Sequence, residues 1–343
     1  MREGTPLPRE TNWRPGSAYP GKRREYEPFS LRTLKSAHNR VKRFHLRPGL
    51  PGSAPGHCDR YGILITVTTQ ARPGGPAAVA ARHGLTKVPQ ITVYFWIVKV
   101  LTTGQGEATS DFLALRYGPV VAVALGATGL TIALILQFRA RRYIAWIYWL
   151  AVDMVSVFGT MAADGLHVEL GVPYDISTPF FAVVLVVVFV VWYRTEKTLS
   201  IHSIYTTRRE AFYWATVMAT FALGTALGDL TATTFGLGYL ASGVLFAVVI
   251  AIPAVAHWKL GMNSILAFWF AYVVTRPLGA SFADWLGVSH SLGGEGLGRG
   301  MVSLISTIVI VGFVAFLAVT RKDVDQSAVK RAAPASHRRL PAA

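Results

Sequence analysis

The stretch WIVKVLTTGQGEATSD, Trp96–Asp111, decides the organisation of the chain, because three later stretches repeat its pattern. The other copies are WLAVDMVSVFGTMAAD at Trp149–Asp164, WATVMATFALGTALGD at Trp214–Asp229 and WFAYVVTRPLGASFAD at Trp269–Asp284. Every copy reads W-x9-G-x4-D, with no change of spacing. Four matches in register indicate internal duplication, since self-similarity of this kind marks a repeat architecture.

The distances between the copies divide the chain into two similar halves. Successive tryptophans lie 53, 65 and 55 positions apart. The first and third copies are 118 positions apart, and the second and fourth are 120 apart. The extra residues of the middle spacing belong to the polar linker Arg194–Arg209, which joins the halves.

The composition is that of a membrane protein. Of the 343 residues, 52% are hydrophobic and 15% are charged, whereas soluble domains carry about 25% charged residues. This excludes an ordinary cytosolic globule. Cys58 is the only cysteine, which excludes a disulfide scaffold and zinc sites built on cysteine pairs.

Eight apolar segments follow one another through the body of the chain. They span about 91–113, 117–138, 143–165, 178–193, 210–230, 237–258, 263–285 and 300–320. Crossing a bilayer takes about 20 residues, so 178–193 is the marginal case. The odd-numbered segments are the more polar, which predicts that they form the interior. We therefore expect an all-α integral membrane protein with eight transmembrane helices. They would form four parallel two-helix repeats, at about 91–138, 143–193, 210–258 and 263–320.

Basic residues in the connections set the expected orientation. One set of connections carries Arg139, Arg141, Arg142, Arg194, Lys197, Arg208, Arg209 and Lys259, while the other carries Arg116 and Arg299. Cytoplasmic loops are enriched in Lys and Arg. Both termini of this multi-pass protein are therefore predicted to be cytoplasmic.

The two ends of the chain hold most of the net charge of +16. Residues 1–86 are rich in Arg, Pro and Gly, and we expect a disordered basic tail. A wrongly assigned start, with the protein beginning near Leu85, is the alternative. The membrane domain is expected at 87–320, followed by a basic cytoplasmic tail at 321–343. The predicted partner of this charge is the lipid bilayer and not nucleic acid.

Four stretches carry a resemblance to a known family: VPQITVYFWIVKVLTT at 88–103, EAFYW at 210–214, GTALGD at 224–229 and RPLGASFAD at 276–284. The chain from Lys87 to Thr320 resembles a bacterial membrane-protein family of four tandem repeats. Each repeat has two transmembrane helices and a tryptophan, and its function is unknown. The resemblance implies this topology and an inner-membrane location, and it implies no activity.

The repeated glycines and tryptophans have structural explanations. Each glycine, Gly106, Gly159, Gly224 or Gly279, is followed four positions later by another small residue. That spacing lets helix backbones approach closely in lipid, so we expect helix packing. Lining of a substrate path is the alternative. The tryptophans, Trp96, Trp149, Trp214 and Trp269, would either anchor the helices at the membrane interface or pack inside.

The repeated aspartates are the main functional candidates. Asp111, Asp164, Asp229 and Asp284 each lie 15 residues after a tryptophan, about 22 Å along a helix. In parallel repeats all four would reach the same side of the membrane, where a ring of carboxylates, together with Glu107, would capture a cation. The alternative is local capping or pairing of each aspartate.

Three further charged residues lie deeper in the spans. Lys99, Asp153 and Arg276 are candidates for gating or coupling, because charges inside a membrane usually have a function. Equal depth predicts a Lys99–Asp153 pair, and Arg276 is expected to pair with Asp284 or Glu107. Pro277 is expected to break or kink the helix.

The sequence thus predicts a transporter or permease for a cation, either a metal ion or a proton-coupled solute. A membrane scaffold or accessory subunit that does not transport is the alternative. We find no catalytic motif and predict neither an enzyme nor a cofactor.

Overall fold

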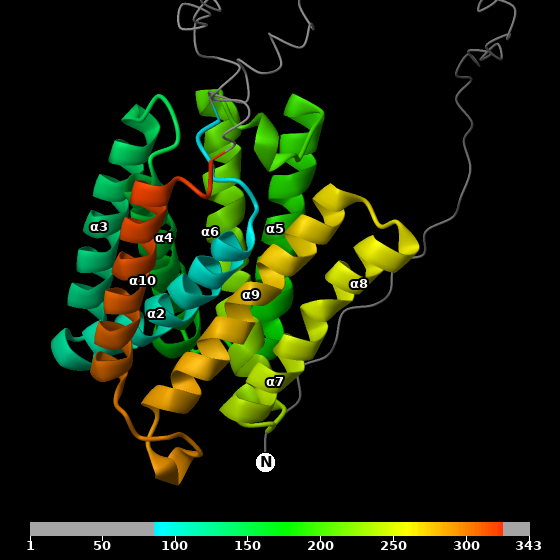
Figure 1. Ribbon diagram of the computed structural model, residues 1–343. Helices are drawn as coiled ribbons and strands as arrows, with labels where there is room; N and C mark the ends of the chain where they lie inside the picture. The colour runs from blue at the N-terminus through cyan, green and yellow to red at the C-terminus, as the bar shows by residue number, and fades with distance from the viewer. Residues whose placement is uncertain (1–85, 325–343) are drawn as a thin grey trace, which may run out of the picture. The chain divides into compact units, whose positions relative to one another are not determined.

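The computed structural model describes residues 86–324, and within that range the chain is helical and contains no strand. The predictions for residues 1–85 and 325–343 lie outside the described residues. The helices are α2 (Val93–Tyr117), α3 (Pro119–Arg139), α4 (Ala145–Asp164), α5 (Tyr174–Glu196), α6 (Thr207–Asp229), α7 (Tyr239–Val249), α8 (Ala251–Leu260), α9 (Ser264–Gly287) and α10 (Arg299–Thr320). Figure 1 shows how they bundle together.

Seven helical stretches are long and apolar enough to cross a membrane. Short π-helical turns extend α4 to Glu169 and α6 to Thr234, and α7 with α8 counts as one stretch. Helix α2 is not among the seven, although its 25 residues would suffice in length. Its charged side chains, Lys99, Glu107, Asp111 and Arg116, keep its hydropathy low.

Two segment boundaries differ from the expectation. The marginal segment 178–193 is in fact a 23-residue helix, because α5 begins at Tyr174 and passes through Pro179. The segment 237–258 is two helices that meet at Ile250. Pro253 explains that division, since a proline cannot donate the hydrogen bond to the residue four positions earlier. Pro277 does not end α9, which continues to Gly287.

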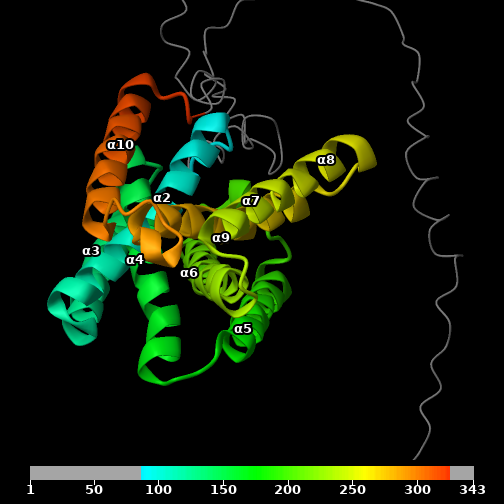
Figure 2. The same cartoon turned by 90° about the horizontal axis from the view of Figure 1, so that it is seen from below.

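The central helices of the bundle, α2, α4, α6 and α9, form a closed ring in which each packs on the next and α9 packs on α2. Each peripheral helix packs on the central helix of the following repeat. Thus α3 lies on α4, α5 on α6, α7 on α9 and α10 on α2, and the view along the bundle shows α2, α4, α6 and α9 between the others (Figure 2). Burial differs between the central and peripheral helices within an apolar 18-residue stretch of each. In α4, α6 and α9, 61–72% of the residues in this stretch are buried, against 17–28% in the peripheral helices. This confirms the interior position of three of the four more polar segments, those that form α4, α6 and α9.

The repeat glycines lie where neighbouring central helices cross. A Cβ atom at Gly106, Gly159, Gly224 or Gly279 would overlap Ser156, Phe221, Arg276 or Thr103, respectively. Each contacted residue stands three positions before the glycine of the next repeat, and the fourth contact returns to the first repeat. The same small residue therefore serves the same close approach four times around the ring.

An aromatic layer fills the centre near the tryptophans. Each repeat tryptophan follows another aromatic residue, and these residues, Phe95, Tyr148, Tyr213 and Phe268, are at most 7% exposed. Trp149, Trp214 and Trp269 are buried with them, whereas Trp96 is partly exposed. Three of the four tryptophans thus pack inside the bundle instead of facing lipid.

Candidate functional site

A cavity of about 340 Å³, which we call the chamber, lies at the ends of the central helices that carry the repeated aspartates. Its acidic lining residues are Glu107, Asp111, Asp164, Glu169, Asp229 and Asp284. All four aspartates of the repeat therefore face one space, as the parallel arrangement of the repeats requires. Carboxylate oxygens of Glu107, Asp111 and Asp164 lie within 4.8 Å of one another, close enough to hold a single metal ion.

Arg276 lies beside the chamber and is fully buried. Its Nη2 donates to Glu107 Oε2 at 2.5 Å, to Thr225 Oγ1 at 2.7 Å and to Thr160 Oγ1, and its Nη1 donates to the carbonyl of Thr103 at 2.6 Å. The Arg276–Glu107 pair is one of the two pairings that the sequence suggested. Because every central helix contributes to this network, it ties the ring together at the depth of the glycine crossings.

The aspartates of the chamber differ in their partners. Asp111 pairs through Oδ2 with Arg299 at the start of α10. The side chain of Asp284 is 7% exposed and forms no hydrogen bond or ion pair with any residue in the described range 86–324. The hydroxyl-bearing residues Tyr174 and Tyr239 complete the polar wall. Asp284 is therefore a nearly buried residue that lines the chamber and has no hydrogen-bond or ion-pair partner among residues 86–324.

The predicted pair between Lys99 and Asp153 is wrong. The Lys99 ammonium has no hydrogen-bond partner among the described residues and lies over the rings of Phe221 and Tyr272, at 4.1 and 4.4 Å from their centroids. Lys99 is three residues after its tryptophan and Asp153 is four after its own, which differs by about 100° around a helix. Residues three after the tryptophan are buried in all four repeats, whereas residues four after it are half-buried. Lys99 and Asp153 therefore lie at a similar depth along their helices, but their side chains point in different directions.

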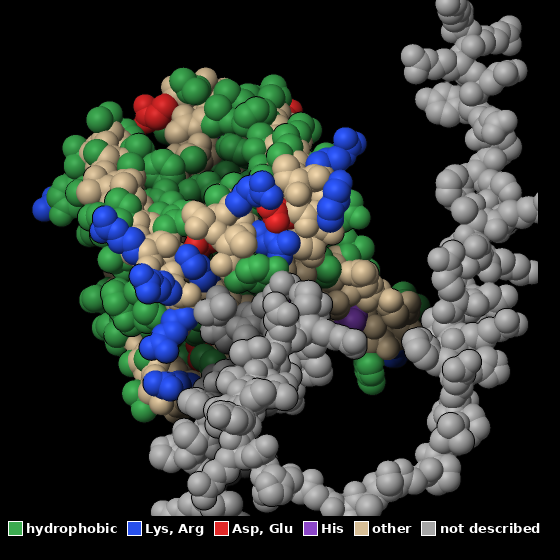
Figure 3. Space-filling model, turned by 90° about the horizontal axis from the view of Figure 1, so that it is seen from above, with side chains coloured by type: hydrophobic (Ala, Val, Ile, Leu, Met, Phe, Trp, Pro, Cys, Tyr) green, Lys and Arg blue, Asp and Glu red, His purple; other side chains and the backbone are tan. Residues whose placement is uncertain are grey.

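The opposite end of the ring is closed by the extended segment 86–92, which enters the bundle before α2 (Figure 1). Lys87 pairs with Glu210 at 2.6 Å, and Gln137 donates to the same carboxylate at 3.0 Å. All three side chains are buried. The backbone of the segment also bonds to Ile204 and Asp323. We call this arrangement the basic-end closure, because the Lys and Arg side chains gather on this face (Figure 3).

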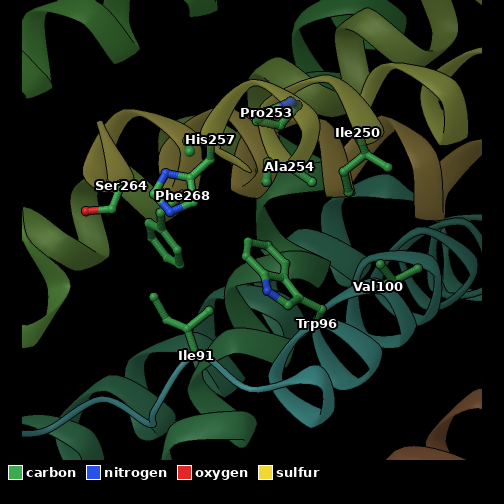
Figure 4. Close-up of a pocket in the computed structure, with 11 residues that line it drawn as sticks. Ile91, Trp96, Val100, Ile250, Pro253, Ala254, His257, Ser264 and Phe268 are labelled. Atoms are coloured by element: carbon green, nitrogen blue, oxygen red, sulfur yellow. The ribbon is translucent and has the colours of Figure 1, made fainter. Parts of the chain in front are cut away.

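A second cavity, of about 390 Å³, lies between α2, α8 and α9. Its wall is apolar, with Trp96 and Phe268 facing His257 across it (Figure 4). The Nδ1 of His257 is engaged by the carbonyl of Met262 at 2.7 Å. Apart from this histidine its lining holds no ionisable side chain, so the cavity lacks the carboxylates that line the chamber.

Some residues of the network escaped the sequence reasoning, although the repeat contained a signal for them. The position after the repeat glycine reads Glu107, Thr160, Thr225 and Ala280, and three of these residues contact Arg276. Aligning the four repeats and comparing this position would have predicted that these polar side chains lie at the same depth in the bundle. Arg299 could not be found in this way, because it is the first residue of α10 and lies outside the repeated pattern.

The comparison with known families agrees with this division into repeats. The family described as Repeat of Unknown Function (DUF347) matches residues 94–143, 147–198, 212–262 and 267–323. The chain belongs to the DUF347 repeat family. Each DUF347 repeat here covers one central helix and the peripheral helical stretch that follows it. No curated protein and no solved structure matches the chain.

Proposed function

We propose that this DUF347 protein is a membrane transporter or permease that takes up its substrate cation in the chamber. The observation that carries the proposal is the convergence of one carboxylate from each of the four repeats on a single cavity. Local capping would not require the four side chains to share one space. Rings of carboxylates attract cations at the mouths of membrane pathways.

The proposal includes an eighth membrane span and an orientation. Helix α2 is 25 residues long and is enclosed by α4, α9 and α10. Its polar side chains would then face protein instead of lipid, which is how membrane proteins accommodate such residues. The exposed basic residues Arg141, Arg142 and Arg208 favour a cytoplasmic position for the end that carries them. The chamber would then face the outside of a bacterial inner membrane, with both termini in the cytoplasm.

The arrangement along the axis of the ring also supports transport. The chamber is followed by the Arg276 network, then by Lys99 between Phe221 and Tyr272, then by the aromatic layer and the basic-end closure. A binding site that is open on one side and closed on the other is what alternating access requires. Lys99, Asp153 and Arg276 are the charges that would respond to passage of the ion.

A non-transporting scaffold is the second candidate. It is favoured by the ion pairs of Glu107 with Arg276 and Asp111 with Arg299, which already balance two carboxylates of the chamber. In a scaffold these pairs would hold the helices together, and the remaining aspartates would have no common role.

Flux into proteoliposomes separates the two candidates. Purified protein would be reconstituted with an ion-sensitive dye inside, and Mn²⁺, Mg²⁺, Ca²⁺, Na⁺ and K⁺ would be added outside in turn. We expect flux of at least one cation, and its loss when the four repeated aspartates are changed together to asparagine. The matched control is Asp175→Asn, since Asp175 is exposed and does not line the chamber. Absence of flux for every cation would favour the scaffold.

A further inference from the structure

We propose that the chamber is a site for one hard divalent metal cation, of the class of Mn²⁺, Mg²⁺ and Ca²⁺, held between Glu107, Asp111 and Asp164. This inference rests on the part of the proposed function which says that the chamber binds a cation. It adds the chemical class of that cation and the residues that bind it.

The spacing of the three carboxylates fits a metal ion. Their oxygens lie within 4.8 Å of one another. Oxygen ligands lie about 2.0–2.6 Å from Mg²⁺ and Ca²⁺, so ligands on opposite sides of one ion are separated by about 4–5 Å.

The donor atoms of the chamber favour a hard ion. The described residues that line it offer carboxylates and hydroxyls, and they include neither histidine nor cysteine. The one sulfur atom belongs to Met161, which packs in an apolar cluster with Ala122 and Val157. Oxygen-only sites suit Mg²⁺, Ca²⁺ and Mn²⁺, whereas soft metals favour thiolate or imidazole.

Both arginines leave the site free to bind. Arg276 uses Oε2 of Glu107, and Arg299 uses Oδ2 of Asp111. The other oxygen of each carboxylate makes no hydrogen bond within residues 86–324. Arg276 also keeps its bonds to Thr103, Thr160 and Thr225. An ion can therefore take Glu107 as a ligand without leaving the guanidinium unpaired.

Asp284 is an independent sign that the chamber is built for a positive ligand. It is 93% buried, lines the chamber and has no hydrogen-bond or ion-pair partner in the described part of the chain. A buried carboxylate without a partner is costly unless something else satisfies it. Six carboxyl groups line the chamber, and two guanidiniums pair with two of them, so the negative charge that the lining can hold exceeds the charge of its arginines. A divalent ion offsets twice as much of this charge as a monovalent one.

Electron paramagnetic resonance of Mn²⁺ tests the proposal, because the sharp six-line signal of free Mn²⁺ broadens on binding. Wild-type protein in detergent would be titrated with Mn²⁺. We expect one tightly bound Mn²⁺ per chain, released by Mg²⁺ or Ca²⁺ and not by equal concentrations of Na⁺ or putrescine. Asp164→Asn and Asp284→Asn should each weaken binding at least tenfold. Asp175→Asn should leave it unchanged.

Each outcome is decisive for one of the two proposals. Absence of bound Mn²⁺ in the wild type, or its release by putrescine as readily as by Mg²⁺, would overturn the metal class whether or not the variants fold. Equal binding by Asp164→Asn, Asp284→Asn and wild type would overturn the assigned site. Flux measured on the same preparations separates the failures. Bound Mn²⁺ without flux of any cation contradicts transport alone, whereas flux of another cation without bound Mn²⁺ contradicts the metal class alone.

Discussion

At the residue scale, Arg276 joins all four central helices. It is fully buried on α9 and bonds to groups on α2, α4 and α6. Its pairing with Glu107 places a buried charge on each side of the α2–α9 contact. Removing only one member of such a pair leaves the other charge uncompensated.

We predict that Arg276→Met lowers the free energy of unfolding by about 3–5 kcal/mol, the usual cost of breaking a buried ion pair from one side. The double variant Arg276→Met/Glu107→Gln should recover part of the loss, because no unpaired charge remains. Denaturant unfolding in detergent measures both. A double variant as unstable as the sum of the two single variants would show that the pair does not couple.

The sequence predicted how deep a side chain lies along its helix better than it predicted the direction in which the side chain points. The fixed spacing from tryptophan to aspartate was enough to bring Asp111, Asp164, Asp229 and Asp284 to one cavity, because a rigid repeat copies both depth and direction. Lys99 and Asp153 lie at a similar depth but occupy different positions of the repeat, three and four residues after the tryptophan, and they do not pair. Arg299 reaches Asp111 from the first position of α10, which follows a glycine-rich connection whose path no periodic pattern specifies.

At the scale of elements, the ring depends on close contacts between the central helices. Gly106 faces Ser156 of α4, whose side chain and backbone both lie where a Cβ would be added. A new methyl group in such a crossing forces the helices apart or strains the side chains. Gly312, in contrast, has no atom within 4 Å of an added Cβ.

We predict that Gly106→Ala destabilises the protein by about 1–3 kcal/mol through overpacking. Gly312→Ala is the matched control, and it should leave stability unchanged or raise it by up to about 1 kcal/mol, since alanine is the better helix former. The midpoints of thermal unfolding of the two variants in the same detergent give the comparison. Equal shifts would mean that the crossing has room for a methyl group.

The basic-end closure is a second element-scale feature with its own test. The carboxylate of Glu210 accepts from Lys87 and from Gln137. We predict that Glu210→Gln loosens the segment 86–92, because Lys87 loses its charged partner. Hydrogen exchange read by mass spectrometry should become faster in that segment. Glu295→Gln, in an exposed connection, serves as the control, and identical exchange in both variants would argue against a closure held by this pair.

At the scale of the whole molecule, composition and repeat spacing were sufficient to predict helices, four repeats and a central set. The family match and the burial of α4, α6 and α9 agree with that prediction. The cyclic order, in which each peripheral helix packs on the next repeat, was beyond it. A repeat pattern specifies what each unit contains, but contacts between units come from side-chain packing across the ring.

Orientation in the membrane is open to a direct labelling test. In a Cys58→Ser background, Glu169→Cys near the chamber and Arg141→Cys on the opposite face each introduce one cysteine. We predict that a membrane-impermeant maleimide labels the cysteine at 169 in intact cells and the cysteine at 141 only after permeabilisation. The opposite pattern would reverse the orientation, and labelling of both in intact cells would exclude the proposed topology.

The four repeated aspartates are proposed to form one cation-binding site. Thermal unfolding in detergent, with and without Mn²⁺, tests this proposal when the aspartates are changed to asparagine singly and together. If they form one electrostatic site, Mn²⁺ raises the unfolding temperature of the wild type, and the quadruple variant loses this shift entirely. Relief of mutual repulsion should then leave the metal-free quadruple variant at least as stable as the wild type. Additive losses of stability from each aspartate, with no Mn²⁺-dependent shift in the wild type at any concentration, would instead show four separate structural contacts.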